Sequence, residues 1–390
     1  MIDSTVSARG RLLLYIQAGA IPRLPDGALG VPNKTAIGLR AFANRWQGPV
    51  AITSLEPPRE ISEATPGNEW VTPAADRGFA AIATISAADI NALRPALVHG
   101  SVNTPGIDDV LALGIPVVLG DDYSPSVRRH ISMLGATNIA DRARIALGAE
   151  RARRRFDRMV RGAAGFHANG YASYEHYRRV HPSALVYFDH RITRADLDSA
   201  RPRSVPDSRP LHLAFSGRLI PMKGVQYLPL LAEELHRRSL DVKISVAGTG
   251  PLSESLKASD HLSLLGHLDF DTEWKNFATS VDVMLFPHVQ GDSSSTYYEA
   301  MGMGVPVLGF ANDTLSPLLR HGGGGWEVRQ GDIRAMADLI EAISRDENLL
   351  RDQSSQALQY MAPLSMESIF DERVRDFIEK AAQKAHGSAR

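Results

Sequence analysis

Two basic side chains follow the apolar run Leu211–Phe215, and their types and spacing suit the binding of a diphosphate. Arg218 offers a planar fork of donors to phosphate oxygens, and Lys223 offers a compact positive charge. Gly217 and Gly224 stand beside them and permit the tight backbone turns of a loop. The same two cations could also be solvated charges on an ordinary loop, and the residue types alone favour neither interpretation.

A second candidate site follows the apolar run Val281–Phe286, where small hydroxyl residues precede an expected helix. These residues are Ser294, Ser295 and Thr296. The N–H groups and the dipole at a helix start attract an anion such as phosphate. Glu299, one turn on, could accept hydrogen bonds from the vicinal hydroxyls of a ribose. Thr296 and Glu299 also have capping-box spacing, which would instead fold the carboxylate back onto the helix start.

Short apolar runs alternate with longer amphipathic segments along the chain, which predicts repeated strand–helix–strand units. Such units form mostly parallel, doubly wound sheets, so we expect an α/β fold that binds ligands beyond the carboxyl ends of its strands. The stretch Asp196–Pro210 holds three prolines and has the composition of a linker. We therefore expect a first domain at residues 1–205, a second at 206–364, and a helix at 365–385 that packs back on the first.

Composition argues against several classes of function. The 390 residues contain no cysteine, which excludes disulfides, thiolate metal sites and cysteine nucleophiles. The formal net charge of −1 argues against a large nucleic-acid footprint. No spacing of His, Asp and Glu indicates a metal site. The start lacks a basic segment before an apolar run, and no apolar run reaches the roughly 20 residues of a membrane span, so we expect a cytoplasmic protein.

Arginines crowd the expected helix at residues 139–161. Such density is typical of a solvated helix face. It could alternatively indicate a surface that meets anionic lipid or a charged acceptor. The sequence therefore leaves peripheral membrane contact through residues 142–161 open.

Five motifs in the second half of the chain follow one another in a fixed order. They are Gly-Arg-Leu with Lys-Gly, then Ala-Gly-Thr-Gly-Pro-Leu, Leu-Gly-His-Leu, Asp-Val-Met-Leu-Phe-Pro, and Tyr-Glu-Ala-Met-Gly-Met-Gly-Val-Pro-Val. In this order they resemble the motifs of the retaining glycosyltransferase family 4, over roughly Leu211 to Ser344. The resemblance implies a GT-B fold, in which two Rossmann-like domains face each other across a cleft and the second holds a nucleotide-sugar donor.

The resemblance also implies roles for individual residues. Arg218 and Lys223 match the family's diphosphate-binding pair, and Glu299 matches the second glutamate of its Glu-x7-Glu motif, which contacts the ribose. Other positions match by their place in the donor-binding loops: Gly217, Ser294, Ser295 and Thr296 near the phosphates and sugar, Gly266 and Leu268 near the nucleobase, and Gly30 in the glycine loop of the first domain.

The chain departs from the family pattern at the first glutamate of that motif, which falls at Gly291. Asp292 is adjacent and could substitute if the loop is shifted. The family's first glutamate normally contacts the donor sugar, so this departure bears on the identity of the sugar.

A second departure lies in the first domain. Many members carry a histidine after a strand that resembles residues 116–119, where this chain has Asp121 and Asp122. Either aspartate could contact the sugar or the acceptor, or could form an Asx turn. His99 and His167 also follow apolar runs, although a single histidine in that setting is more often structural.

These observations lead us to expect a metal-independent, retaining glycosyltransferase of the hexosyltransferase kind, with no separate cofactor. Its donor would be a UDP or GDP sugar, and its acceptor a saccharide, a lipid-linked sugar or a small molecule. The candidate catalytic residues are Arg218, Lys223, Asp122 and His99. Two alternatives remain: a non-catalytic nucleotide-sugar-binding protein, suggested by the missing glutamate, and a sugar-nucleotide epimerase of the same architecture.

Overall fold

The computed structural model describes residues 11–65, 67–72, 78–205 and 209–387, which form two compact units. The first unit contains the described residues of Met1–Asn169, Ser173–Tyr187 and Glu367–Arg390. The second unit contains Gly170–Ala172 and the described residues of Phe188–Met366. Each unit has its own sheet and its own buried core.

The continuous part of the second unit begins at Phe188, earlier than the boundary expected at residue 205. Phe188 stacks on Tyr298, with ring centroids 4.5 Å apart. Ile192 packs so closely on Gly302 that a Cβ added to this glycine would lie 2.8 Å from the isoleucine side chain. Phe188 and Ile192 come before the proline-containing stretch in the sequence, and their apolar contacts attach residues 188–205 to the second unit.

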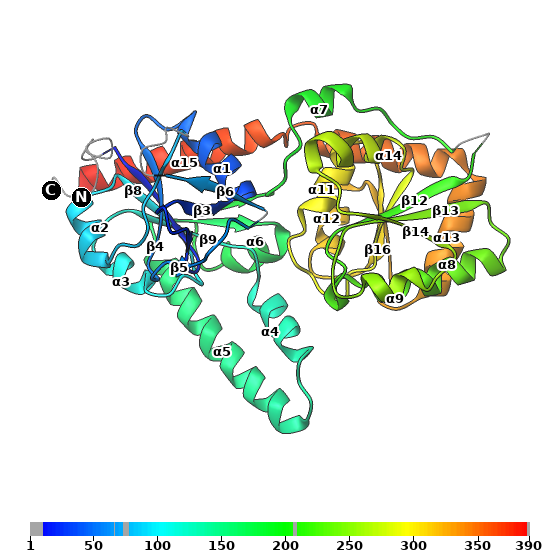
Figure 1. Ribbon diagram of the computed structural model, residues 1–390, viewed down its shortest axis with the longest axis horizontal. Helices are drawn as coiled ribbons and strands as arrows, with labels where there is room; N and C mark the ends of the chain where they lie inside the picture. Colours follow the sequence, from blue (N-terminus) through cyan, green and yellow to red (C-terminus); the bar gives the residue numbers. More distant parts are fainter. Residues whose placement is uncertain (1–10, 66, 73–77, 206–208, 388–390) are drawn as a thin grey trace. The chain divides into compact units, whose positions relative to one another are not determined.

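The first unit is built on a seven-stranded sheet whose neighbouring strands are all parallel (Figure 1). Its strand order is β11-β10-β9-β8-β1-β4-β7. The strands are β1 (Leu13–Gln17), β4 (Val50–Ser54), β7 (Ala80–Ala81), β8 (Leu97–Ser101), β9 (Val117–Asp121), β10 (Gly165–Asn169) and β11 (Ala184–Tyr187). Their apolar runs are buried on both faces, as parallel sheets covered by helices require.

The described residues of the first unit also form a four-stranded sheet and seven helices, one of them shared with the second unit. The small sheet has the order β5-β2-β3-β6 and consists of β2 (Pro22–Arg23), β3 (Leu29–Pro32), β5 (Arg59–Glu60) and β6 (Asn68–Val71). The helices are α1 (Asn33–Ala43), α2 (Ala87–Leu93), α3 (Ile107–Ala112), α4 (Pro125–Met133), α5 (Ile139–Gly162), α6 (Tyr171–Tyr177), which spans the border between the units, and α15 (Met366–Gly387).

The last helix, α15, supplies part of the core of the first unit. Phe370 and Phe377 both pack on Phe42 of α1, at ring-centroid distances of 4.8 and 5.3 Å. Arg45 forms an ion pair with Asp371 at 2.5 Å. A segment from the end of the chain therefore completes a core that began with β1 and α1.

The second unit has a six-stranded parallel sheet of order β14-β13-β12-β15-β16-β17. This is the doubly wound Rossmann order, and its direction reverses between β12 and β15. The strands are β12 (Leu211–Ser216), β13 (Val242–Ala247), β14 (Leu262–Gly266), β15 (Val283–Phe286), β16 (Val307–Phe310) and β17 (Gly325–Val328). In such sheets a ligand site forms at the carboxyl edge beside the reversal.

Helices cover both faces of this sheet, as its doubly wound topology requires. They are α7 (Arg194–Ser199), α8 (Leu228–Arg237), α9 (Ser253–Lys257), α10 (Lys275–Thr279), α11 (Ser295–Gly302), α12 (Leu315–Gly322), α13 (Ile333–Arg345) and α14 (Glu347–Met361). Short turns of other helix types lie at η2 (Pro221–Lys223), η3 (Val225–Tyr227) and η4 (Phe270–Trp274).

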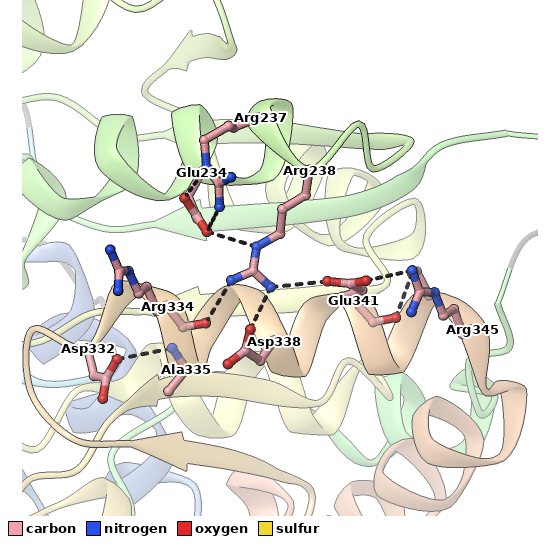
Figure 2. A network of polar contacts seen from close by, with 10 residues as sticks. Glu234, Arg237, Arg238, Asp332, Arg334, Ala335, Asp338, Glu341 and Arg345 are labelled. Carbon is pink, nitrogen blue, oxygen red and sulfur yellow. Dashed lines mark hydrogen bonds and ion pairs between the residues drawn. The ribbon is translucent and has the colours of Figure 1, made fainter.

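An ion-pair network joins α8 to α13 in the second unit (Figure 2). The guanidinium of Arg238, just past α8, lies 2.8 Å from Glu234, 2.6 Å from Asp338 and 3.1 Å from Glu341. Single exposed ion pairs contribute little to stability, but a shared guanidinium fixes the two helices in register. The network lies over the apolar core that both helices bury and contains none of the candidate site residues.

Candidate functional site

A cavity of about 270 Å³ lies at the carboxyl edge of the second unit's sheet. It is bordered by the ends of β12 and β13, the residues after β14 and the start of α11, so it occupies the reversal point of the strand order. Six residues singled out from the sequence line it: Gly217, Arg218, Leu268, Ser295, Thr296 and Glu299. Segments far apart in the sequence thus meet around one cavity.

Glu299 is buried and turned toward a partner that the sequence did not reveal. Its Oε1 accepts a hydrogen bond from Nε of Arg191 at 3.3 Å. The N-cap of α11 is Ser294, two residues before Thr296, and it makes no side-chain capping bond. The capping-box alternative, with Glu299 folded onto Thr296, is therefore wrong, and the carboxylate lies in the wall of the cavity.

One side of the cavity consists of Arg191 and two aromatic side chains. The guanidinium of Arg191 lies 3.6 Å from the ring centroid of Phe270, and the Phe270 ring stacks on Trp274 at a centroid distance of 5.1 Å. All three residues line the cavity. Sequence motifs gave no signal for them, because Arg191 comes from the segment between the two sheets and the aromatic pair belongs to a short π-helical turn.

Lys223 lies beneath the loop at residues 287–294 and does not line the cavity. Its Nζ is 2.7 Å from Oδ2 of Asp292 and 3.3 Å from Oγ of Ser294. Burial lowers the pKa of Lys223, and the neighbouring carboxylate of Asp292 opposes that shift. Ser294 in turn lies 3.0 Å from the hydroxyl of Thr296, so a polar chain connects the buried lysine to the cavity wall.

Gly224 brings Lys223 into this position. It ends the η2 turn with φ of 67°, in the left-handed region that favours glycine. A Cβ at this position would lie 1.6 Å from the carbonyl oxygen of Pro287. At Gly224 the lysine loop and the loop at residues 287–294 therefore meet backbone to backbone, and a side chain at position 224 would separate them there.

The position of the family's first glutamate has no room for a side chain. A Cβ at Gly291 would lie 2.8 Å from Cβ and 2.9 Å from N of Asp313. The nearest acidic group in the loop is Asp292, which is buried with its Oδ1 lacking a hydrogen-bond partner among the described residues. His288 Nε2 and both amide atoms of Gln290 share this condition. Buried polar groups usually have partners, so this loop has unused capacity for a polar ligand.

The remaining second-unit candidate, Gly266, ends β14 with φ of 72° and does not itself line the cavity. In the first unit, Gly30 lies on β3, where an added Cβ would meet the ring of Trp70 at 2.8 Å. Asp122 follows β9, is exposed, and accepts a hydrogen bond from Nδ2 of Asn169 at 2.9 Å. Asp122 thus stands at a carboxyl strand edge, where a ligand can reach it.

Asp121 differs from its neighbour because it is buried. It pairs with Arg128 and accepts hydrogen bonds from the backbone of Tyr123 and the hydroxyl of Tyr177, at 3.1 and 3.3 Å. Burial raises the pKa of Asp121 to about 6, although Arg128 opposes the shift. These contacts anchor the start of α4, and Asp122 is the exposed member of the pair.

His99 belongs to the core of the first unit and not to a reaction site. Its Nδ1 donates to the carbonyl of Val118 at 2.9 Å, and its Nε2 lies 3.1 Å from a guanidinium nitrogen of Arg373. The same guanidinium reaches Nδ1 of His167 at 3.3 Å, and Nε2 of His167 donates to Asp376 at 2.9 Å. Both rings are buried with both nitrogens occupied, so neither histidine can exchange a proton with a substrate.

This histidine pair predicts how the first unit responds to acid. Burial lowers the pKa of His167 to about 4 and that of His99 well below 6.5, whereas both titrate near 6.5 when unfolded. The contribution of these histidines to stability is therefore present above pH 6.5 and is lost as the pH falls toward 4, by roughly 1.5 kcal/mol for His167 between pH 6.5 and 5 and with the same sign for His99. The raised pKa of Asp121 acts in the opposite direction, because the folded state takes up this proton more readily than the unfolded state. Between pH 6 and 5 it offsets roughly 1 kcal/mol of the loss.

We expect calorimetry of the full chain to show a falling melting temperature between pH 6.5 and 5. His167→Gln should unfold at a lower temperature at pH 7 yet show a shallower decline with acid, because one proton-uptake site is gone. An equally steep decline in the variant would contradict the role given to His167.

Two further observations limit the chemistry of the described residues. Across residues 11–65, 67–72, 78–205 and 209–387, no three His, Asp or Glu side chains gather in a way that could hold a metal ion. Within the same ranges, no helix is both long enough and apolar enough to cross a membrane.

Comparison with known proteins finds similarity to glycosyltransferases over part of the second unit. The family model described as Glycosyl transferases group 1 matches residues 197–360. The putative colanic acid biosynthesis glycosyltransferase WcaL of Escherichia coli is 26% identical over 160 residues, which is 38% of this chain and 39% of that protein. The phosphatidyl-myo-inositol mannosyltransferase of Mycobacterium leprae is 32% identical over 115 residues, 28% of this chain and 30% of that one. These alignments span less than half the length of either relative.

Solved structures resemble the chain over nearly its whole length. HepE of Anabaena, in complex with UDP, has a TM-score of 0.65 at 12% identity, covering 94% of this chain and 99% of that one. The sucrose-phosphate synthase of Thermosynechococcus elongatus has a TM-score of 0.64 at 15% identity, covering 96% and 100%. At these low sequence identities the structural similarity shows the fold alone, and it confirms the expected GT-B fold class. Residues 197–360, fewer than half of the chain, are similar to the glycosyl transferases group 1 family.

Proposed function

We propose that the protein is a retaining glycosyltransferase that moves a sugar from a nucleotide-diphosphate sugar to an acceptor hydroxyl. The observation that carries the proposal is the cavity in which Arg218, the start of α11 and Glu299 meet. The family match supports it, as do relatives whose names refer to colanic acid and capsular polysaccharide biosynthesis. A solved structure of the same fold contains UDP. Polysaccharide or glycoconjugate synthesis is therefore the proposed setting.

In this proposal each part of the cavity takes one part of the donor. The guanidinium of Arg218 and the N–H groups at the start of α11 bind the diphosphate. Glu299, oriented by Arg191, accepts hydrogen bonds from the ribose hydroxyls, and the backbone near Leu268 holds the base. The sugar extends toward Asp292 and Gln290, whose buried polar atoms have unused hydrogen-bonding capacity among the described residues.

The proposed reaction needs no metal, because cationic side chains take up the charge of the leaving group. The bond between the anomeric carbon and the diphosphate oxygen breaks, and its electron pair stays on that oxygen beside Arg218, while Lys223 contributes its charge from beneath the loop at residues 287–294. The acceptor hydroxyl forms the new bond on the same face and passes its proton to the departing phosphate. Asp122, an exposed carboxylate at the carboxyl edge of the first unit's sheet, is a proposed ligand of the sugar or acceptor in its own unit.

A nucleotide screen tests the donor site directly. We expect millimolar UDP or GDP to raise the melting temperature by about 5 °C, since a ligand at 100 times its dissociation constant stabilises the folded state by about 2.7 kcal/mol. UMP and GMP serve as controls, because they lack the second phosphate that Arg218 would bind. If no nucleoside diphosphate shifts the melting temperature, the proposal fails.

The same protein is then incubated with the matching nucleotide sugars and a panel of acceptors. Release of nucleoside diphosphate that depends on an acceptor supports transfer. Binding without turnover across the panel would indicate a non-catalytic binding protein instead, and conversion of the donor without any acceptor would indicate an epimerase.

A further inference from the structure

Helices α4 and α5 of the first unit form a hairpin that extends away from the sheet (Figure 1). We call residues 125–162 the basic hairpin. It contains ten arginines and only three carboxylates, Asp141, Glu150 and Asp157, in a chain whose net charge is −1. Positive charge is therefore concentrated on this projection and is compensated elsewhere in the chain.

Four of these ten arginines lie on one face of α5. Exposed residues recur at spacings of three and four, which places them on one helix face: Leu147, Arg151, Arg154, Arg158 and Arg161. The opposite face is covered, since Ala149, Ala152 and Phe156 line a cavity that α4 closes with Arg128 and Ser132. The basic stripe is about 20 Å long at the rise of an α-helix and points away from the hairpin's partner helix.

Some arginines of the hairpin serve its own structure, and others do not. Arg153 pairs with Glu150 and Asp157, and Arg155 pairs with Asp108 of α3. Arg151, Arg158 and Arg161 make no ion pair or hydrogen bond through their side chains with any residue that the structure describes. These three guanidinium groups are available for an external anion.

Apolar side chains are exposed at the end of the hairpin and on the stripe. Leu134, Ile139 and Leu147 are 54%, 86% and 55% exposed. They are three of the six exposed large apolar side chains among the described residues. Leu134 caps the end of α4 and Ile139 begins α5, so two of them form the tip. Exposed apolar groups beside unpaired cations are typical of an interfacial surface.

We propose that the basic hairpin docks this protein on an anionic membrane surface. Arginines of the stripe would contact lipid phosphates, while the tip residues enter the boundary between headgroups and acyl chains. A polysaccharide or nucleic acid would engage the arginines but leave the apolar tip in water. A lipid surface satisfies both features at once. The inference concerns binding alone and stands independently of the proposed transfer reaction.

Vesicle sedimentation with the full chain tests this surface. We expect binding to vesicles in which a third of the phosphatidylcholine is replaced by phosphatidylglycerol, weakening with salt, and little binding to phosphatidylcholine alone. Replacing three stripe arginines should weaken binding about 100-fold, at a factor of about 5 per basic residue. The variant is Arg151→Gln, Arg158→Gln and Arg161→Gln. Its matched control changes three exposed arginines elsewhere: Arg179→Gln, Arg320→Gln and Arg375→Gln.

A second variant separates insertion from simple charge attraction. Leu134→Ser with Ile139→Ser should weaken binding about tenfold and leave a larger dependence on salt, because the apolar contribution is lost. All variants should keep the wild-type melting temperature, since the altered side chains are exposed. Equal binding to both vesicle types would overturn the proposal. Equal losses of vesicle binding in the stripe variant and the control variant would also overturn it. A third contrary result would be a stripe variant that changes only self-association or heparin binding and leaves vesicle binding intact.

Discussion

Arg218→Ala should lower kcat/KM for sugar transfer about 100- to 1000-fold, while the melting temperature stays within about 2 °C of wild type. The guanidinium lines the cavity, is exposed, and forms no ion pair with another described residue, so the fold does not depend on it. Its loss removes the charge that would face the departing diphosphate. Initial rates with the donor identified by the nucleotide screen provide the measurement.

Two further variants test whether the loss of activity is specific to the guanidinium of Arg218. Arg218→Lys should recover part of the activity, because it keeps the charge but loses the two-pronged geometry. Arg320→Ala, an exposed change on α12, should leave the rate within about twofold of wild type. A loss in Arg218→Ala no larger than that of Arg320→Ala would show that the cation takes no part in the reaction.

Lys223→Met should lower the melting temperature of the second unit by about 10 °C. The substitution leaves the carboxylate of Asp292 buried without its partner at 2.7 Å, and breaking a buried pair in this way costs about 3 kcal/mol. Transfer activity should fall together with stability, because the lysine also holds Asp292 and Ser294 in the loop beside the cavity. Calorimetry resolves the first effect, and rate measurements well below the transition resolve the second.

The double variant Lys223→Met with Asp292→Leu tests whether the stability effect belongs to the ion pair. Removing both charges should restore most of the lost melting temperature, since an apolar pair of similar size avoids the unpaired carboxylate. Activity should remain low in the double variant. Should the double variant be no more stable than Lys223→Met, the lost stability arises from packing around the lysine stem.

Much of the second unit could be predicted from its sequence, because its strands are apolar runs bounded by small residues. The turn after β12 and the start of α11 were both expected to hold ligand-binding residues, and the structure brings Arg218, Ser295, Thr296 and Glu299 around one cavity. Local patterns succeed here because parallel strands bring every βα turn to the same edge of the sheet.

Other parts of the site depend on contacts that no local pattern encodes. Arg191 approaches Glu299 from a segment more than a hundred positions earlier in the chain, and the partnership of Lys223 with Asp292 depends on a loop-to-loop contact at Gly224. His99 fails as a candidate for the same reason. An apolar run followed by a histidine predicts a strand, but only the fold reveals that α15 covers its ring.

The contribution of α15 to the first unit has a consequence for the order of events during synthesis. Arg373, Asp376 and Phe377 fill positions around His99 and His167 that stay unfilled until after every residue of the second unit has been translated. On the ribosome, the second unit can therefore complete its core first, while β1 through β11 wait for their last helix. Released chains that end at residue 366 should hold a protease-resistant second unit beside a protease-sensitive first one.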